Sequence, residues 1–434
     1  MPHEKFHYRS LEEVQETAKA QRGALSLSEN MSCLAQPLSA GRIRTRNRIA
    51  LQPMEGTDGT DGGSPTELTK RRYLRFAKGG AGLIWFEAVA VAPEARASLH
   101  QLYLTEENLS DFQRLVEAIK EDGLRENGFA PYLAMQATHS GRYSKPDGTP
   151  HPLIAQHNPI LEEGLEHLPF RVLTDDELKR SEDFFADTAR LAERAGFDAV
   201  DVKCCHRYLA SELLSAYNRE GAYGGSFENR TRYIRNCVRA AKSACNIHIA
   251  CRMNAYDGFP YPWGFGVTEE TGLEPDLAEA KALAKLLAQD GVELFNVTIG
   301  NPYKNPHVNR PYDAGAYTPA EHPLCGVVRI MDCCAEIQSM VPKLPVVGSG
   351  FSYLRQFSAN LAAGMVGEGR ISLAGFGRLA LANPNFPNQI FQTGHIGRDR
   401  VCISCGQCAL LLRHGIPAGC VVRDRAQYAP YTGE

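Results

Sequence analysis

The sequence predicts an α/β fold, a (β/α)8 or TIM barrel. Short apolar segments suited to buried strands alternate along the chain with amphipathic stretches of helical period, and eight such strand segments are present. The chain of 434 residues is long enough to form a barrel of roughly 250 residues. An open doubly wound sheet is the alternative. No G-x-G-x-x-G segment opens a helix after the first strand, so the dinucleotide-binding form of that sheet is unsupported.

The predicted strands and helices follow one another in regular order. Strands are expected at 48–52, 82–91, 130–136, 199–202, 248–253, 294–298, 344–347 and 371–375. Helices are expected at 109–122, 175–195, 229–244, 275–290 and 329–341. Two stretches rich in Pro, Gly or polar residues, 258–275 and 301–323, are predicted to be long loops on the face that carries the active site.

Two segments lie outside the predicted barrel. Residues 1–40 are polar and predict an N-terminal helical extension, in which Ser10 and Glu13 have the spacing of a capping box. Residues 41–395 are assigned to the barrel, and residues 396–434 to a short Cys-rich C-terminal tail.

The charge balance argues against a nucleic-acid-binding surface. The chain has 47 Lys and Arg residues against 50 Asp and Glu residues, a net charge of −3, whereas nucleic-acid-binding domains carry a basic face. No apolar run approaches the roughly 18 residues of a membrane span, and the charged N-terminus lacks the apolar core of a secretory signal. We therefore expect a cytoplasmic protein with no nucleic-acid or membrane partner.

The 13 cysteines divide into two groups. Nine are scattered and are expected to be reduced, small core residues. The other four are Cys402, Cys405, Cys408 and Cys420. Clustered thiols in a chain without a secretory signal indicate a metal centre rather than disulfides. Three close cysteines and one distant one favour an iron–sulfur cluster over structural zinc, which usually takes two C-x-x-C pairs, and zinc stays open as the alternative.

Polar residues follow several predicted strands, where a parallel barrel places its chemistry. Three proton-capable side chains follow strand 199–202, at Lys203, His206 and Tyr208. Gln136 ends the third strand and Arg252 the fifth. Backbone N–H groups suited to a phosphate follow the last two strands, at Gly348, Ser349, Gly350, Gly377 and Arg378. Each of these residues alone also fits a solvated strand end or an internal ion pair, so only their combination indicates a functional site.

Several segments together resemble the old yellow enzyme family of NADH:flavin oxidoreductases. They are NRIALQPM (47–54), GLIWFEAVAV (82–91), QATHSGR (136–142), the stretch that ends in YGGSFENR (195–230), VGSG (347–350), GFGR with LANPNFP (375–387) and the C-terminal cysteines. The cysteines place the resemblance closest to the iron–sulfur branch of the family, which includes 2,4-dienoyl-CoA reductase and trimethylamine dehydrogenase.

The resemblance implies that FMN binds at the C-terminal face of the barrel. Pro53 and Met54 would lie against the flavin, and Gln136 would contact its pyrimidine edge. Arg252 would sit near flavin N1 and O2, where its charge stabilises the anionic reduced form. The turns at 348–350 and 377–378 would hold the phosphate.

The chain departs from the family pattern at two positions. Lys203 replaces the first histidine of the usual H-x-x-[HN]-x-Y set that holds the substrate carbonyl. A lysine gives a compact full charge where histidine gives a neutral donor, which suits a carboxylate, a thioester oxygen or a developing enolate. Glu55 follows Pro53 and Met54, where Thr, Cys or His is more usual. It is expected either to contribute to the cofactor site or to point into the loop 57–63.

The resemblance implies an FMN-dependent oxidoreductase that reduces an electron-poor C=C bond conjugated to a carbonyl or carboxyl group. FMN N5 would pass the hydride, Lys203 and His206 would hold the developing enolate oxygen, and Tyr208 would protonate the α-carbon. A 4Fe–4S cluster at the four cysteines would supply electrons one at a time.

The expected partners follow from the same resemblance. Relatives in the iron–sulfur branch continue into a nucleotide-binding domain, whereas this sequence ends soon after Cys420. We therefore expect a separate electron-donor protein, NAD(P)H as a direct or indirect donor, and a homo-oligomer or larger complex.

Two other functions stay open. One is an amine dehydrogenase or demethylase of the trimethylamine dehydrogenase type, in which Glu55 and loop aromatic residues receive a cation. Those aromatic residues are Tyr256, Phe259, Tyr261 and Trp263. The other is an electron-transfer subunit of a larger complex, whose barrel only relays electrons.

Overall fold

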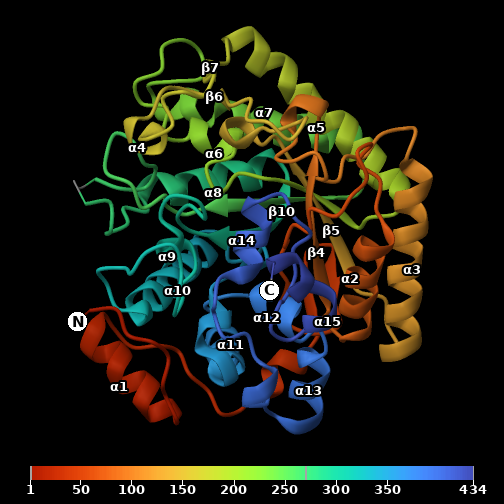
Figure 1. The fold of residues 1–434 in the computed structure, drawn as a ribbon, viewed down its shortest axis with the longest axis vertical. Helices are drawn as coiled ribbons and strands as arrows, with labels where there is room; N and C mark the ends of the chain where they lie inside the picture. The colour runs from red at the N-terminus through yellow and green to blue at the C-terminus, as the bar shows by residue number, and fades with distance from the viewer. Residues whose placement is uncertain (1, 269–270, 434) are drawn as a thin grey trace.

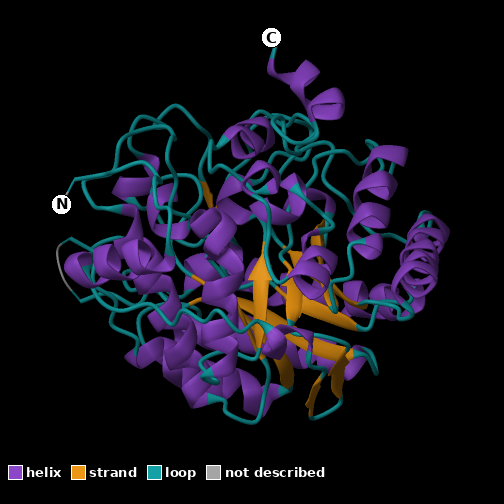
Figure 2. Cartoon of the chain, turned by 90° about the horizontal axis from the view of Figure 1, so that it is seen from below, coloured by secondary structure: helices purple, strands orange, loops and turns teal. Residues whose placement is uncertain are grey.

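Eight parallel strands form a closed barrel at the centre of the molecule, and helices pack around it (Figures 1 and 2). The computed structural model describes residues 2–268 and 271–433. In barrel order the strands are β3 (Ile49–Leu51), β4 (Leu83–Ala90), β5 (Tyr132–Thr138), β8 (Ala199–Val202), β9 (His248–Asn254), β10 (Val292–Thr298), β11 (Val346–Gly348) and β12 (Leu373–Phe376). β12 pairs with β3 to close the barrel. The predicted (β/α)8 barrel is confirmed, and each predicted strand segment overlaps one of these strands.

The longer helices cover the outside of the barrel. They are α2 (Glu67–Lys78), α3 (Leu109–Asn127), α5 (Asp175–Ala195), α7 (Phe227–Ala244), α8 (Ala278–Asp290), α10 (Pro323–Met340), α11 (Ser358–Gly367) and α13 (Phe386–Thr393). In α5, Thr174 forms a capping box and Gly196 ends the helix in the left-handed conformation. The five predicted helices are present. The sequence did not predict α2, which is dense in basic residues, or α11, which consists mainly of small ones.

Shorter elements occupy the loops. They are α4 (Pro159–Glu162), α6 (Leu209–Leu213), α9 (Pro306–Asn309), α12 (Arg378–Ala382), α14 (Gln407–Arg413), α15 (Arg425–Tyr428), and the strands β6 (Leu153–Ile154) and β7 (Arg171–Val172), which pair outside the barrel. In the part of the chain that the structure describes, no helix has both the length and the apolar character needed to cross a bilayer.

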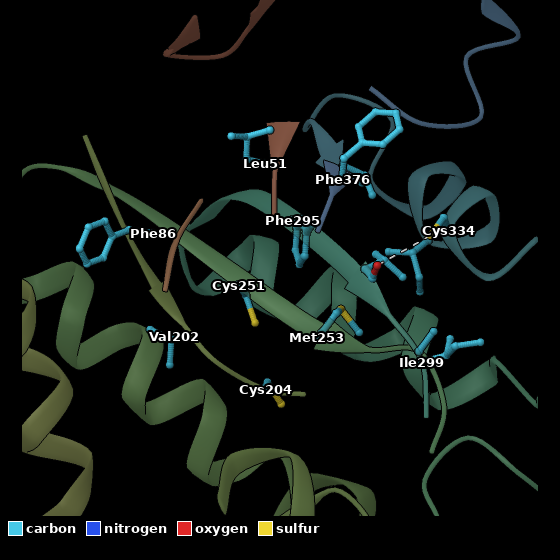
Figure 3. Close-up of a cluster of buried hydrophobic side chains, with 14 of the residues drawn as sticks. Leu51, Phe86, Val202, Cys204, Cys251, Met253, Phe295, Ile299, Cys334 and Phe376 are labelled. Carbon is cyan, nitrogen blue, oxygen red and sulfur yellow. Dashed lines mark hydrogen bonds between the residues drawn. The ribbon is translucent and has the colours of Figure 1, made fainter. Parts of the chain in front are cut away.

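Side chains of the barrel strands alternate between the barrel interior and the helices. The interior layer includes Ala50, Leu83, Trp85, Ala134 and Leu294. Outward-facing side chains labelled in Figure 3 include Leu51, Phe86, Val202, Cys251, Met253, Phe295 and Phe376. The barrel interior is therefore a packed core rather than a pore, and polar side chains enter it only toward the strand ends.

An irregularity in β4 turns one carboxylate away from the barrel interior. The pairing of β4 with β5 shifts register between Phe86 and Ala88. Glu87 therefore reaches the neighbouring helix α2, where it accepts hydrogen bonds from the Arg72 guanidinium at 2.5 Å and the Tyr73 hydroxyl at 3.1 Å. Because of the bulge, Glu87 of strand β4 holds helix α2 by hydrogen bonds.

The same network fixes the loop that follows β3. Arg72 pairs with Asp58 as well as Glu87, so one buried guanidinium holds two buried carboxylates. Glu87 also accepts the backbone N–H of Gly56 at 2.7 Å. Because Gly56 follows Glu55 directly, the network fixes the position of the Glu55 backbone.

A hairpin that the sequence did not predict closes the N-terminal end of the barrel. β1 (Leu38–Ala40) pairs with β2 (Ile43–Thr45) in antiparallel register. Leu38 and Ile43 are buried and belong to the interior layer of the barrel. The expected boundary between residues 40 and 41 falls in the turn of this hairpin, and the division into domains stays a prediction.

The N-terminal extension packs on the barrel of its own chain. Helix α1 (Leu11–Gln21) lies against α10 (Figure 1). Ser10 caps α1 by accepting the N–H of Glu13 at 3.3 Å, which confirms half of the predicted capping box. The Glu13 carboxylate accepts the N–H of Arg9 at 2.6 Å, one residue before the cap. Phe6 is buried, and the Cζ atom of Arg355 lies over its ring, 4.9 Å from the ring centroid.

The Cys-rich tail crosses the C-terminal end of the barrel. The N–H of Ala418 donates to the carbonyl oxygen of Gly56 at 2.8 Å. Asp424 pairs with Arg71, at 2.8 Å, and with Arg75, both on α2. The tail is thereby attached to the barrel, and only its last turns project from the body (Figure 2).

We expect Arg72→Met to destabilise the protein by about 3–5 kcal/mol, because Asp58 and Glu87 would be left buried without a counter-charge. Urea unfolding measures the change. Arg71→Met is the matched control on the same helix: Arg71 is partly exposed and shares Asp424 with Arg75, so its loss is expected to cost less than about 1 kcal/mol. Equal destabilisation by the two variants would contradict the role given to Arg72.

Candidate active site

An open cavity of about 1140 Å³, its mouth included, lies at the C-terminal end of the barrel. Every barrel strand, or the loop that follows it, contributes to the wall. Twelve residues predicted from the sequence line it: Pro53, Met54, Glu55, Gln136, Lys203, His206, Tyr208, Arg252, Ser349, Gly350, Gly377 and Arg378. The structure therefore brings these residues together, and their roles stay predictions.

Strand alternation explains why these side chains meet. In β5 the interior residue Ala134 is followed two positions later by Gln136, and in β9 Ala250 is followed by Arg252. Lys203 continues the interior row of β8 in the same way. The cavity is the continuation of the barrel interior beyond the point where apolar residues give way to polar ones.

Asp201 is buried inside the barrel and orients three neighbours. Its carboxylate accepts hydrogen bonds from Trp85 Nε1 at 2.8 Å, Gln136 Nε2 at 2.6 Å and the backbone N–H of Arg252 at 2.6 Å. Burial raises the pKa of Asp201, and these donors act in the opposite direction. Because Gln136 commits its N–H group to Asp201, its amide oxygen remains available as an acceptor for an N–H at the edge of a heterocycle.

Arg252 carries a charge that no carboxylate of the described residues pairs with directly. The side chain is buried, its Nε has no hydrogen-bond partner, and it lines the cavity. Burial lowers the pKa of Arg252. A buried cation needs an anionic or acceptor partner, so Arg252 fits the anionic edge of a bound cofactor.

Gln52, which the sequence analysis did not single out, holds the turn after β11. Its amide nitrogen donates to the Gly348 carbonyl at 3.2 Å and to Ser349 Oγ at 3.0 Å, and its oxygen accepts from Asn296 Nδ2 at 2.7 Å. Gly348 therefore lies behind the wall as an acceptor for Gln52 and is not among the residues that line the cavity. A Cβ at Gly375 would lie 2.0 Å from Gln52 Nε2 and 2.6 Å from the Gly348 oxygen, so a larger residue does not fit there.

Three arginines meet where the cavity reaches the tail. Arg378, Arg310 and Arg413 line the wall, and no acidic side chain in the described ranges pairs with them. Arg378 Nη2 donates to the Pro311 carbonyl at 3.0 Å, while its Nη1 is buried without a partner. Burial and the charge of Arg378 lower the pKa of Arg310 to about 10. Guanidinium groups beside the glycine turns suit a phosphate. The sequence did not single out Arg310 and Arg413, because they lie in a loop and the tail rather than at strand ends.

Lys203 and Tyr208 are in direct contact. Lys203 Nζ lies 3.5 Å from the centroid of the Tyr208 ring, in a cation–π arrangement. Within the described residues Nζ makes no hydrogen bond or ion pair, and burial lowers the pKa of Lys203 to about 8. The ammonium group is therefore available to a ligand oxygen in the cavity.

His206 is neutral and has an unusual backbone conformation. Its φ is 64° and that of Arg207 is 63°, in the left-handed region that non-glycine residues rarely adopt. The Asn254 side chain accepts the His206 N–H at 3.2 Å. Asn309 Nδ2 donates to the Ile299 carbonyl at 2.8 Å and lies 3.2 Å from His206 Nε2, which therefore accepts and leaves the ring proton on Nδ1. Burial and nearby cations lower the pKa of His206 well below its usual value.

Glu55 lies in the cavity wall instead of pointing only into the loop that follows it. Its Oε1 is buried without a hydrogen-bond partner. Burial raises the pKa of Glu55 to about 7, and the charge of Lys203 acts in the opposite direction. Among the described residues of the wall, Glu55 is the one carboxylic acid.

The four cysteines of the tail line a second cavity, of about 370 Å³, which shares Cys408 and Arg378 with the first. The sulfur atoms of Cys402 and Cys420 each accept a backbone N–H, at 3.4 and 3.3 Å. All 13 cysteines fall in the described ranges, and none forms a disulfide. In those ranges, no three His, Cys, Asp or Glu side chains are arranged to hold a metal ion. The four thiols therefore share one cavity without converging on a single point.

The aromatic loop residues that were considered for an amine substrate do not line the first, larger cavity at the end of the barrel. Tyr256, Phe259, Tyr261 and Trp263 are all absent from its wall. Tyr256 is buried beside Arg329, and Tyr261 is exposed. The aromatic rings that the described wall does contain are those of Tyr208 and Tyr303.

Comparison with known proteins identifies the family. The model of the NADH:flavin oxidoreductase / NADH oxidase family matches residues 33–394. The chain belongs to this family. The family inferred from the sequence is therefore confirmed.

Curated relatives cover different parts of the chain. An NADH oxidase of Thermoanaerobacter brockii is 28% identical over 371 residues, which are 84% of this chain and 51% of the relative. An NADPH dehydrogenase of Bacillus pumilus is 32% identical over 62% of this chain and 73% of its own length. A cinnamate reductase of Clostridium sporogenes is 26% identical over 91% of this chain and 58% of its own length. The chain thus spans about half the length of the NADH oxidase.

Solved structures share the fold. A 2-naphthoyl-CoA reductase superposes with a TM-score of 0.74 at 20% identity, over 91% of this chain and 57% of the other. Morphinone reductase in complex with tetrahydroNAD superposes with a TM-score of 0.62 at 22% identity, over 84% of this chain and 92% of the other. These matches confirm the barrel. The place of the chain in the iron–sulfur branch stays a prediction.

We expect the FMN-loaded protein to bind an inert aromatic carboxylate, benzoate, more weakly as the pH rises from about 6 to about 9. Glu55 gains a negative charge as the pH passes about 7, and Lys203 loses its positive charge as the pH passes about 8, so both changes oppose an anion. Calorimetric titration measures the affinity.

Lys203→Met should remove the change in affinity near pH 8. It should also weaken benzoate binding by about tenfold or more, because a charge-assisted hydrogen bond is lost. Lys304→Met is the matched control, since Lys304 is a more exposed lysine that pairs with Glu163. An affinity that does not change over this pH range would contradict the arrangement of charges described for the cavity.

Proposed function

We propose that this protein is an FMN-dependent ene-reductase that reduces an electron-poor C=C bond conjugated to a carbonyl or carboxyl group. The observation that carries the proposal is the unpaired Lys203 ammonium group in the cavity wall, in contact with Tyr208 and near the neutral His206. A fixed cation beside a proton donor suits a substrate on which negative charge develops at oxygen and a proton is taken up at carbon.

The charge of the cavity favours an anionic substrate. Arg252 and Arg310 also line it but would be neutralised by the flavin and its phosphate, so Lys203 is the cation left for the substrate. Glu55 is the opposing carboxylic acid of the described wall, with a pKa raised toward neutrality. A cationic amine would be repelled by Lys203, and the aromatic loop residues that were expected to receive it lie elsewhere. Reduction of an enoate is therefore favoured over amine dehydrogenation.

The residues of the wall fit FMN. Arg252 offers an unpaired cation and Gln136 an amide oxygen to the flavin edge, and Pro53 and Met54 offer an apolar surface. The backbone at Gly350, Ser349 and Gly377, with the arginines beside it, would hold the phosphate. When bound, FMN supplies a hydride to the β-carbon of the substrate.

The chain's own residues would bind the substrate and move the proton. Lys203 and the Nδ1–H of His206 would donate to the carbonyl or carboxyl oxygen, where charge develops in the transition state. Tyr208 would give its phenolic proton to the α-carbon as general acid. Burial raises the pKa of Tyr208 well above 10, so the hydroxyl is protonated at neutral pH.

The tail would hold a 4Fe–4S cluster next to the flavin. Four cysteines that line one cavity, three close in the sequence and one distant, suit a cluster rather than structural zinc, which usually takes two C-x-x-C pairs. When bound, the cluster supplies single electrons. Cys408 borders both cavities, which would place the two cofactors next to each other.

The source of electrons would be NAD(P)H, used directly or through a separate donor protein, as the names of the NADH oxidase and NADPH dehydrogenase relatives suggest. The cinnamate reductase relative supports an enoate as substrate. A homo-oligomer or complex and a cytoplasmic location complete the proposal.

We expect the reduced, FMN-loaded protein to be reoxidised by cinnamate but not by trimethylamine-type amines, as followed by anaerobic stopped-flow absorbance. Tyr208→Phe should slow this step by about 100-fold or more, because the general acid is lost, and leave reduction of the flavin unchanged. Lys203→Ala should also lose turnover and retain its flavin. Wild-type rates in both variants would remove these residues from the reaction.

We expect an anaerobic preparation to contain about four irons per chain, as a 4Fe–4S cluster requires, and an EPR signal after reduction with dithionite. Cys405→Ser should lower the iron content. Cys325→Ser is the matched control, because Cys325 is a half-buried cysteine outside the tail. Zinc in place of iron would make the tail a structural site and exclude electron supply through it.

A further inference from the structure

The Tyr208 hydroxyl is hydrogen-bonded to a second tyrosine, Tyr303, at 2.8 Å. Tyr303 lies in the loop after β10, far from Tyr208 in the sequence, and also lines the cavity. The sequence analysis did not single it out, and no step described above uses it. Two phenols that share one hydrogen bond, here a buried one and a half-buried one, can pass a proton between them, because either oxygen can act as donor.

Tyr303 is held rigidly in this position. The Asn301 side-chain oxygen accepts the N–H groups of Tyr303 and Lys304, at 2.7 and 2.8 Å. Asn301 Nδ2 donates to the hydroxyl of Tyr143 at 2.7 Å, and the Tyr143 ring packs 4.1 Å from that of Tyr303, centroid to centroid. The contact between Tyr208 and Tyr303 is therefore built by the fold and is not a chance approach of two surface side chains.

Glu55 is placed to exchange protons with this pair. It lines the same cavity as both tyrosines, and its Oε1 is buried without a hydrogen-bond partner. Its negative charge contributes to raising the pKa of both Tyr208 and Tyr303. The cavity is open, so water reaches its wall. A carboxyl group that changes protonation near neutral pH can take a proton from water and give it onward.

We propose that Tyr303 and Glu55 form a proton relay that acts through Tyr208. The proton of Tyr208 Oη goes to the α-carbon of the substrate, and the hydroxyl of Tyr303 donates its proton to the phenolate that remains. The carboxylic acid of Glu55 then protonates Tyr303 through an intervening water and regains a proton from the solvent. Lys203, over the Tyr208 ring, stabilises the negative charge during the transfer. The inference rests on the proposed function, since it supplies the proton for that reaction.

The test is Tyr303→Phe in the FMN-loaded protein, with cinnamate as substrate. The rate of reoxidation of the reduced protein should fall by about 10- to 100-fold, because a hydrogen bond to a charged group is lost in the transition state. The Kd for 3-phenylpropanoate, the saturated product, should stay within about twofold, since the ring and its packing remain. Tyr223→Phe is the matched control: it removes the hydroxyl of a buried tyrosine that donates to Glu182 at 2.7 Å and does not line the cavity.

A double-mutant cycle distinguishes a relay from two independent effects. If Glu55 acts through Tyr303, the variant that carries both Glu55→Gln and Tyr303→Phe should be no slower than the slower single variant. The cycle of Glu55→Gln with Tyr223→Phe should be additive. Additive losses in the first cycle, or a wild-type rate in Tyr303→Phe, would overturn the relay. A wild-type protein that reduces no enoate would overturn the proposed function and the relay with it.

Discussion

A buried carboxylate inside the barrel, Asp201, is the interaction on which the rest of the site depends. Burying a charge is costly, and here the cost is offset by three short hydrogen bonds from three strands. If one of these donors moved away, the Asp201 carboxylate would stay buried and lose a hydrogen bond. Gln136 and the backbone of Arg252 are therefore fixed by the stability of the barrel itself, which is how a packed interior comes to position a cofactor site.

The loops above the barrel are fixed by a second set of buried polar contacts. His206 and Arg207 occupy the left-handed backbone region, which costs energy for residues with a Cβ. The buried ion pair of Arg207 with Asp257, at 2.8 Å, and the hydrogen bond from the His206 N–H to Asn254 compensate for this cost. Asn254 also donates to Asp257 at 2.8 Å, so the end of β9 determines the direction of the imidazole.

Most of the barrel and nine of the twelve residues of the site could be predicted because they depend on local pattern, whereas Pro53, Met54 and Glu55 were expected only from the resemblance to a family. Apolar strand segments are visible in the sequence, and a polar residue that ends such a segment must lie at the mouth of the barrel. What escaped prediction depends on partners far away in the chain. Arg72 matters through Glu87 on a bulged strand, and Tyr303 matters because a loop brings it to Tyr208. The sequence contains no spacing that links such residues, just as it contains none that links Gln52 to the turn at Gly348.

The opposite pKa shifts of Glu55 and Lys203 connect these constraints to the chemistry. Burial pushes the carboxyl group up to about 7 and the ammonium group down to about 8, so each is near the pH at which it changes charge. An anionic oxygen bound beside Lys203 favours the protonated amine, and it also favours the neutral form of Glu55. Binding of such a substrate therefore raises the pKa of both groups, so that Glu55 and Lys203 are both protonated before the proton transfer begins. A cationic ligand would have the reverse effect, which is the physical reason that an anionic enoate, rather than an amine, is proposed as the substrate.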